Sequence, residues 1–365
     1  MTTNAEKIAR KHSAQWDTVL ECIVAKVKAA TSREEAFAIA TKPFSESIIQ
    51  KMTEDTFSAE AVFNSEPQDN IEPKCDAMNG IALAVSRGNI AACVELLKYF
   101  TKEDINSKDI TVWGYREAFS PLHIALNPTI NRTASLLEID DAYVSRLATI
   151  IRLLIDKGIE PDIRFKGHYN NQPMAGGTGR GHDYLDARLL NQLRAELLLG
   201  GADPTLKGTY FFFREDDREA STKIAFNRFI AMPRNEKTKI KGRLHSEVIT
   251  DFKALMQDET LQDSMRQNQE AMTAFQEVGT PSVAKGFTFD ALHRRRARMP
   301  AFQSFMKASL AEKQKIVAML KEPVRNDFLE LVQLRVQQLD EARELLGLPQ
   351  VINANDVSRG GPAPR

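Results

Sequence analysis

The stretch SPLHIAL, at residues 120–126, begins the segment of the chain that decides the fold. That segment closes with TIIRLLIDKGIEPD at residues 149–162, and a similar ending, LRAELLLGGADPTLKG, follows at residues 193–208. Each ending has adjacent leucines, then a glycine able to end a helix, then a turn with acidic residues and proline. Two near copies of one helix ending indicate internal repetition, which has to be considered before any other fold.

A further copy lies upstream, in NGIALAVSRGNIAACVELLKYF at residues 79–100. Gly88 and Asn89 predict a turn between two helices, and the second helix ends in Leu96 and Leu97. The repetition therefore covers three segments between residues 76 and 207, about a third of the chain.

These segments resemble the ankyrin repeat, which has the pattern T-P-L-H-x-A, then a V-x-x-L-L helix, then G-A-D. The resemblance implies helix pairs stacked into a solenoid, with projecting finger loops and a concave face that binds a partner protein. It also implies that the histidine bonds backbone in the neighbouring turn and stiffens the start of its helix. The residues that carry the structural motif are Pro121, Leu122, His123, Ala125, Gly158 and Gly201.

The segments depart from the regular repeat in length. An ankyrin unit has about 33 residues, whereas the leucine pairs here are 57 residues apart (Leu96 to Leu153) and then 44 (Leu153 to Leu197). We therefore expect an all-α protein with degenerate ankyrin repeats and enlarged finger loops at residues 75–235. A helical cap at residues 1–74 precedes them, and a helical domain at 236–350 and a disordered tail at 351–365 follow.

Local patterns support helices in both flanks. Trp16, Val19 and Ile23 recur at helical spacing, and Ser32 with Glu35 predicts a capping box at the next helix. Residues 300–321 and 324–347 predict two long C-terminal helices. The apolar stripe of the last helix is too short for a coiled coil, so we expect it to face a bundle rather than a dimer partner.

The glycine-rich stretch MAGGTGRGHDYLDARLL, at residues 174–190, raises the question of a nucleotide-binding loop. A Walker loop needs G-x-x-x-x-G-K-[ST] after a buried strand, and here no lysine follows Gly181 and a helix and turn precede the loop. We expect a long finger loop instead, since binding residues concentrate on projecting loops. Its candidate contact residues are Tyr169, Asn170, Asn171, Arg180 and His182.

Catalytic and metal-binding hypotheses have less support. His168, His182 and Asp183 could hold a metal only if a flexible loop brought them together, so neither a metal nor a cofactor is expected. Cys75 lacks the flanking signature of a nucleophile, and Cys22 and Cys93 fall on apolar helical faces. An enzyme with an unrecognised catalytic domain in the flanking helices remains the alternative.

Charge and composition limit the partners. The 49 basic and 49 acidic residues balance, so no nucleic-acid partner is expected. The dense basic patch, Arg294, Arg295, Arg296 and Arg298, is either a solvated helix face, which we favour, or a site for phosphate groups or an anionic membrane.

Localisation is inferred from the same composition. Three cysteines suit a reducing compartment, and neither a leader-like apolar segment nor a membrane-spanning run is visible. We expect a cytoplasmic protein. The architecture resembles bacterial effectors that engage eukaryotic host proteins, so export through a specialised system stays open.

Overall fold

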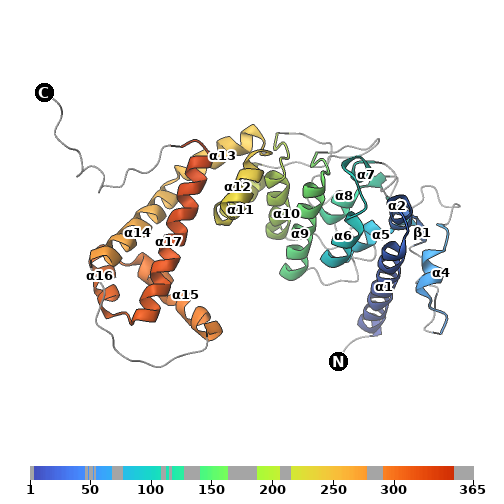
Figure 1. Ribbon diagram of the computed structural model, residues 1–365, viewed down its shortest axis with the longest axis horizontal. Coiled ribbons are helices and arrows are strands. Elements are labelled where there is room, and N and C mark those ends of the chain that lie inside the picture. Colours follow the sequence, from blue (N-terminus) through green and yellow to red (C-terminus); the bar gives the residue numbers. More distant parts are fainter. Residues whose placement is uncertain are drawn as a thin grey trace. The chain divides into compact units, whose positions relative to one another are not determined.

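The computed structural model of the chain describes residues 4–45, 48, 52, 55–67, 77–107, 112–114, 117–126, 140–162, 187–205, 215–277 and 291–348. Within these ranges only the backbone is described for residues 4–12, 112–114, 117–119, 187–188, 215–217, 259–260, 277 and 291–298. The described chain is predominantly helical, as predicted, with two short antiparallel strand pairs (Figure 1). None of its described helices is long and apolar enough to cross a membrane.

The chain divides into two compact units. Unit 1 contains Met1–Ala225 and Arg243–His245, and unit 2 contains Phe226–Gly242 and Ser246–Arg365. Each unit has its own apolar core, the first around helices α1 to α10 and the second around α14 to α17.

Unit 1 begins with α1 (Asn4–Ala29), α2 (Arg33–Thr41) and α4 (Ala59–Phe63), and strand β1 (Phe44–Ser45) pairs with β2 (Ala77–Met78). The apolar face predicted for α1 is confirmed, because its members lie in the core: Trp16, Val19, Leu20, Ile23 and Val27. Strand β1 was not expected, since two residues are too few to show an alternating pattern.

The predicted cap of α2 is confirmed in one half only. Ser32 is the N-cap, and its hydroxyl accepts the backbone N–H of Glu35 at 3.1 Å. The Glu35 carboxylate accepts the backbone N–H of Thr31 at 2.7 Å and its hydroxyl at 2.8 Å. The capping interaction therefore reaches one residue further upstream than in the standard box.

The central part of unit 1 is built from helix pairs: α5 (Gly80–Ser86) with α6 (Ile90–Leu97), and α8 (Pro121–Leu126) with α9 (Asp141–Lys157). Helix α5 contacts α8 and α6 contacts α9, so the second pair lies on the first (Figure 1). Helix α10 (Ala187–Leu199) packs on α9 and α8. Three short elements lie in the connection between α6 and α8: α7 (Lys102–Ile105), β3 (Val112–Gly114) and β4 (Glu117–Phe119).

Helix α11 (Glu215–Ala231) contributes residues to both units. Unit 2 continues with α12 (Arg234–Lys241), α13 (Ser246–Met256), α14 (Glu259–Glu277), α15 (Ala291–Lys307), α16 (Leu310–Met319) and α17 (Glu322–Leu345). Helix α14 contacts both α16 and α17. The predicted bundle face of α17 is confirmed, since Phe328 and Val332 share a core with Phe302, Phe305 and Phe275.

The single long helix predicted for residues 300–321 is wrong. The chain breaks at Ala308 and Ser309, between α15 and α16. Ser309 caps α16, and its hydroxyl and backbone N–H both bond the Glu312 carboxylate, at 2.9 and 3.0 Å. This S-x-x-E box stabilises the start of a new helix at Ser309, although the apolar pattern continues across the break.

Candidate functional site

The predicted finger-loop contacts lie outside the described residues. Tyr169, Asn170, Asn171, Arg180 and His182 all fall between Asp162, in the turn after α9, and Ala187, the first residue of α10. The structure therefore gives the two anchor points of this segment and not the positions of its side chains.

The SPLHIAL stretch forms helix α8 and is buried along its whole length. Pro121 is the first helical residue, where its missing N–H leaves no intrahelical hydrogen bond unmade. The backbone N–H of Ser120 donates to Nδ1 of His123 at 3.2 Å, and the N–H of His123 lies 3.3 Å from the Ser120 hydroxyl. Leu122 and Ala125 face the core. His123 thus holds the turn that starts α8.

Two glycines end the helices with the similar sequence endings. Gly158 follows α9 with φ of 105°, and Gly201 follows α10 with φ of 96°, both in the left-handed region that favours glycine. A Cβ on Gly158 would lie 2.8 Å from the Lys102 side chain, and one on Gly201 would lie 2.3 Å from the carbonyl oxygen of Arg243. Each glycine therefore allows close packing against a neighbouring turn.

Polar side chains connect these turns in sequence order. Oδ1 of Asn106 accepts the backbone N–H of Glu160 at 2.9 Å, and the carboxylate of Asp162 accepts the backbone N–H of Asp203 at 2.9 Å. Nε2 of His245 lies 3.7 Å from Oδ1 of Asp203. Hydrogen bonds therefore join the turn after α7 to the turn after α9, and the turn after α9 to the turn after α10, while His245, after α12, lies near the last of these turns. We call this series the turn ladder, made of Asn106, Glu160, Asp162, Asp203 and His245.

Arg243 attaches the last turn of the ladder, after α12, to helices α9 and α10. Its Nε donates to the carbonyl of Leu199 at 3.0 Å, at the end of α10, and its Nη1 lies 2.7 Å from the carboxylate of Asp156 on α9. A cation near helix C-termini also interacts favourably with the negative ends of their dipoles. These contacts explain why residues 243–245 belong to unit 1.

Helices α9 and α10 share a charged pair at their interface. Both carboxylate oxygens of Glu196, a fully buried side chain, accept bonds from the Arg152 guanidinium, at 2.5 and 2.6 Å. Arg152 remains 44% exposed, so it carries its charge at the edge of the interface. Such two-point pairing fixes the relative orientation of two helices more than it adds stability.

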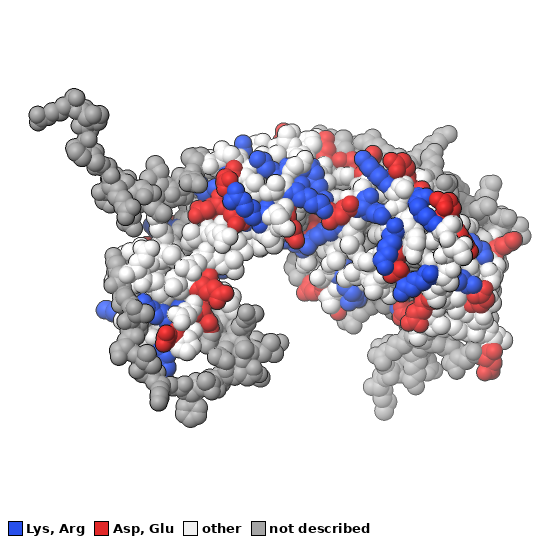
Figure 2. All heavy atoms as spheres, viewed as in Figure 1, with Lys and Arg blue, Asp and Glu red and all other residues white. Residues whose placement is uncertain are grey.

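The face of the molecule drawn in Figure 2 has no large region of one charge among its described residues. Figure 2 shows basic and acidic side chains interspersed over the face in view. The predicted basic patch, Arg294, Arg295, Arg296 and Arg298, lies in α15, which continues through Pro300. Its side chains are outside the described residues, so both interpretations of the patch remain predictions.

Unit 2 contains an open groove of about 480 Å³. Helices α12, α14 and α17 line it, with Arg234, Met272, Gln333, Val336, Gln337, Asp340, Glu341 and Glu344. Beneath it lies Lys237, which is fully buried and donates from Nζ to the Glu341 carboxylate at 2.9 Å and to the carbonyl of Gln338 at 3.0 Å. No sequence pattern predicts this groove, because its lining comes from three separate helices.

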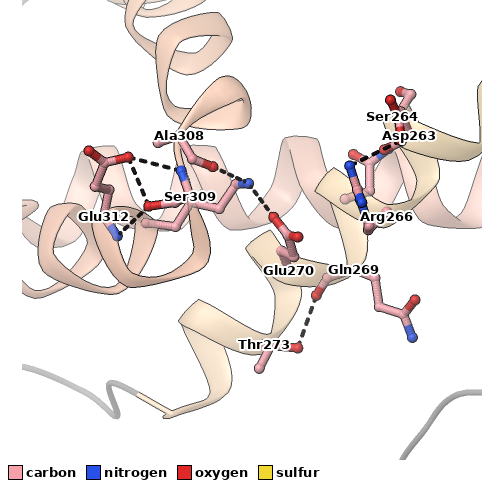
Figure 3. A network of polar contacts seen from close by, with 11 residues as sticks. Asp263, Ser264, Arg266, Gln269, Glu270, Thr273, Ala308, Ser309 and Glu312 are labelled. Carbon is pink, nitrogen blue, oxygen red and sulfur yellow. Dashed lines mark hydrogen bonds and ion pairs between the residues drawn. The ribbon is translucent and has the colours of Figure 1, made fainter. Parts of the chain in front are cut away.

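A second fully buried lysine fixes the break between α15 and α16. Nζ of Lys313 lies 2.9 Å from the Glu270 carboxylate on α14 and 2.6 Å from the carbonyl of Ala308. Figure 3 shows this network beside the Ser309–Glu312 cap. Lys313 donates to the carbonyl of Ala308, just after α15, and to a carboxylate on α14. Its role is therefore structural.

Neither described cysteine has the environment of a nucleophile. Cys93 is fully buried, and burial raises its pKa far above the usual range. Burial also raises the pKa of Cys22, with a further contribution from the nearby Glu60 carboxylate. Over the described residues, no three histidine, cysteine or acidic side chains are grouped so that they could hold a metal ion. Cys75 lies outside that description.

Comparison with known proteins adds no relative: no family model, no curated protein and no solved structure matches the chain. Its function therefore has to be argued from its own residues.

Proposed function

We propose that the chain is a protein-binding protein in which residues 75–235 are degenerate ankyrin repeats, stacked as a solenoid between an N-terminal helical cap and a C-terminal helical domain. The finger loop with Tyr169, Asn170, Asn171, Arg180 and His182 contacts the partner, together with the concave face of the stack. The sequence support is the match of residues 120–125 to the T-P-L-H-x-A pattern, with Ser120 in place of the threonine.

The turn ladder is the structural observation that carries this proposal. In a repeat protein each unit contacts only its neighbours, so equivalent turns of adjacent units lie together. The bond from Asp162 to Asp203 joins the turns that follow the two similar helix endings. The matching left-handed glycines, Gly158 and Gly201, give both turns the same backbone geometry.

The packing order of the helices is a second support. The pair α5–α6 contacts the pair α8–α9, which in turn contacts α10, and one apolar core continues through all of them. A stack of this kind is a rigid support for long connections, and rigid supports favour binding by the loops that they present.

Affinity capture tests the proposal. The immobilised full-length protein and its Tyr169→Ala/Arg180→Ala variant are each incubated with a eukaryotic lysate, because the architecture resembles effectors that act on eukaryotic proteins. We expect a protein that the wild type retains and that the variant retains at least ~10-fold less well, as for the loss of two interface anchors.

The matched control is Arg266→Ala, which removes one cation from an exposed position in α14, outside unit 1. This variant should capture as the wild type does. Equal capture by the wild type and the loop variant would contradict the role of the finger loop. Capture of no protein by the wild type would contradict the proposed function itself.

A further inference from the structure

The side-chain amide of Asn106, directly after α7, is hydrogen-bonded through its nitrogen and its oxygen. Nδ2 donates to the carbonyl of Lys102, in α7 itself, at 2.8 Å and to the carbonyl of Gly158, in the turn after α9, at 2.8 Å. Oδ1 accepts the backbone N–H of Glu160, in the same turn, at 2.9 Å. A primary amide has two N–H donors, so both are used. Asn106 therefore connects α7 to the backbone of the turn after α9.

The two bonds to this turn lie on either side of Ile159. They engage the carbonyl of the residue before it and the N–H of the residue after it. The side chain of Ile159 is 2% exposed and belongs to the core of unit 1. The backbone N–H groups of Gly158 and Ile159 donate to the carbonyls of Ile155 and Leu154, at 2.9 and 3.0 Å. Hydrogen bonds and burial together fix the backbone of this turn.

The turn is also packed closely on α7 and bonded on its other side. Gly158 has φ of 105°, and a Cβ there would lie 2.8 Å from Cγ of Lys102. At the end of the turn, the carboxylate of Asp162 accepts the backbone N–H of Asp203 at 2.9 Å. Residues 158–162 are therefore held both from α7 and from the turn after α10.

The proposed finger loop begins at the next residue of the chain, residue 163. A segment that becomes ordered in a complex loses conformational entropy, and a support that is already fixed reduces this loss. Binding residues need such support from side chains that are themselves held by hydrogen bonds. Asn106 meets this condition, because its bond to Lys102 fixes it to its own helix.

We propose that Asn106 is a positioning residue for partner binding. It fixes the turn from which the finger loop begins, and it acts through that turn rather than by contact with the partner. This inference rests on the proposed function and adds to it a residue that the ankyrin pattern does not single out.

Hydrogen exchange of the free full-length protein tests the hold of Asn106 on the turn without a partner. In Asn106→Ala the Glu160 amide should exchange at least ~5-fold faster than in the wild type, because it loses its acceptor. Asn89→Ala is the matched control, since Asn89 also accepts a backbone N–H of unit 1, that of Ala92, at 3.0 Å. It should leave exchange at Glu160 unchanged. Equal exchange at Glu160 in Asn106→Ala and the wild type would overturn the proposal.

Binding measurements test the positioning role. The probe is the protein that the full-length wild type retains from the eukaryotic lysate, after purification. Asn106→Ala should bind it at least ~5-fold more weakly than the wild type, and Asn89→Ala should bind it equally well. When Asn106→Ala is added to Tyr169→Ala/Arg180→Ala, the further loss should be less than ~2-fold, because Asn106 acts through the loop that this variant has already disabled.

The outcomes separate this proposal from the proposed function. Unchanged affinity of Asn106→Ala, or a full additional loss in the loop variant, would overturn the positioning role and leave the proposed function standing. Capture of no protein by the wild type would contradict the proposed function, and the positioning role with it.

Discussion

The carboxylate of Asp162, in the turn after α9, accepts the backbone N–H of Asp203, in the turn after α10, at 2.9 Å. The two residues are 41 positions apart and lie in the turns that follow two similar helix endings. This bond joins two adjacent turns of the ladder. A substitution of Asp162 therefore measures how much one connection of the ladder contributes to the free energy of unfolding.

Asp162→Ala should lower the free energy of unfolding by about 1–2 kcal/mol, because a partly buried backbone N–H loses its acceptor. Urea unfolding followed by circular dichroism measures this loss, and hydrogen exchange should be faster at the Asp203 amide than in the wild type. Glu66→Ala, at an exposed position of unit 1, is the control. An unchanged exchange rate at Asp203 would mean that the bond contributes nothing.

Gly201→Ala and Gly242→Ala should have opposite effects. Gly201 has a positive φ, and a Cβ there would lie 2.3 Å from the Arg243 backbone, so alanine should cost at least ~2 kcal/mol. Gly242 has φ of −62° and no neighbour closer than 3.5 Å, so alanine should stabilise by about 0.4–1 kcal/mol. Thermal unfolding of the two variants measures the difference, and equal melting temperatures would contradict the described turn.

Arg152→Ala should destabilise unit 1 by about 2 kcal/mol, because the buried carboxylate of Glu196 loses its two-point partner. The loss is smaller than for a fully buried pair, since Arg152 is itself 44% exposed. Lys223→Ala breaks an exposed pair with Glu219 and should change stability by no more than about 0.5 kcal/mol. Chemical unfolding of both variants compares them, and similar small losses would show that the interface tolerates the loss of the Arg152 guanidinium.

The Lys237–Glu341 pair should make unit 2 sensitive to acid. The hydrogen bond from Lys237 lowers the pKa of Glu341 in the folded protein below its unfolded value of about 4.3. The stabilisation is therefore fully present above the unfolded pKa and is lost as the pH falls through the folded pKa. The free energy of unfolding should fall between about pH 5 and pH 3, and less steeply in Glu341→Gln, where that carboxyl is absent.

Glu330→Gln serves as the control for this pH series, because it removes a carboxylate from the same helix at an exposed position. Parallel pH profiles of the wild type and Glu341→Gln would show that the buried lysine does not hold an ionised partner.

Features set by neighbouring residues could be predicted from the sequence. The apolar face around Trp16 and Ile23, the N-cap at Ser32 and the helix end before Gly158 each depend on residues within a turn or two. The break at Ser309 has an equally local cause, its S-x-x-E box. The apolar period continues across this box, so the periodicity alone predicts one uninterrupted helix.

Long-range features could not be predicted in this way. Lys313 and Lys237 occupy helical positions where a lysine usually faces solvent, and their acidic partners lie 43 and 104 residues away. The acids of the groove likewise resemble an ordinary solvated stripe of α17 until Met272 and Arg234 are placed beside them. Only the packing of separate helices distinguishes these residues from surface charges.

Hydrogen exchange of the full-length protein, with and without the partner that it captures, tests the central claim most directly. Binding through the finger loop on a stack of repeats predicts slower exchange in peptides covering residues 163–186 when the partner is present, with unit 2 unchanged. Unchanged exchange at residues 163–186 in the complex would contradict the claim that this segment contacts the partner.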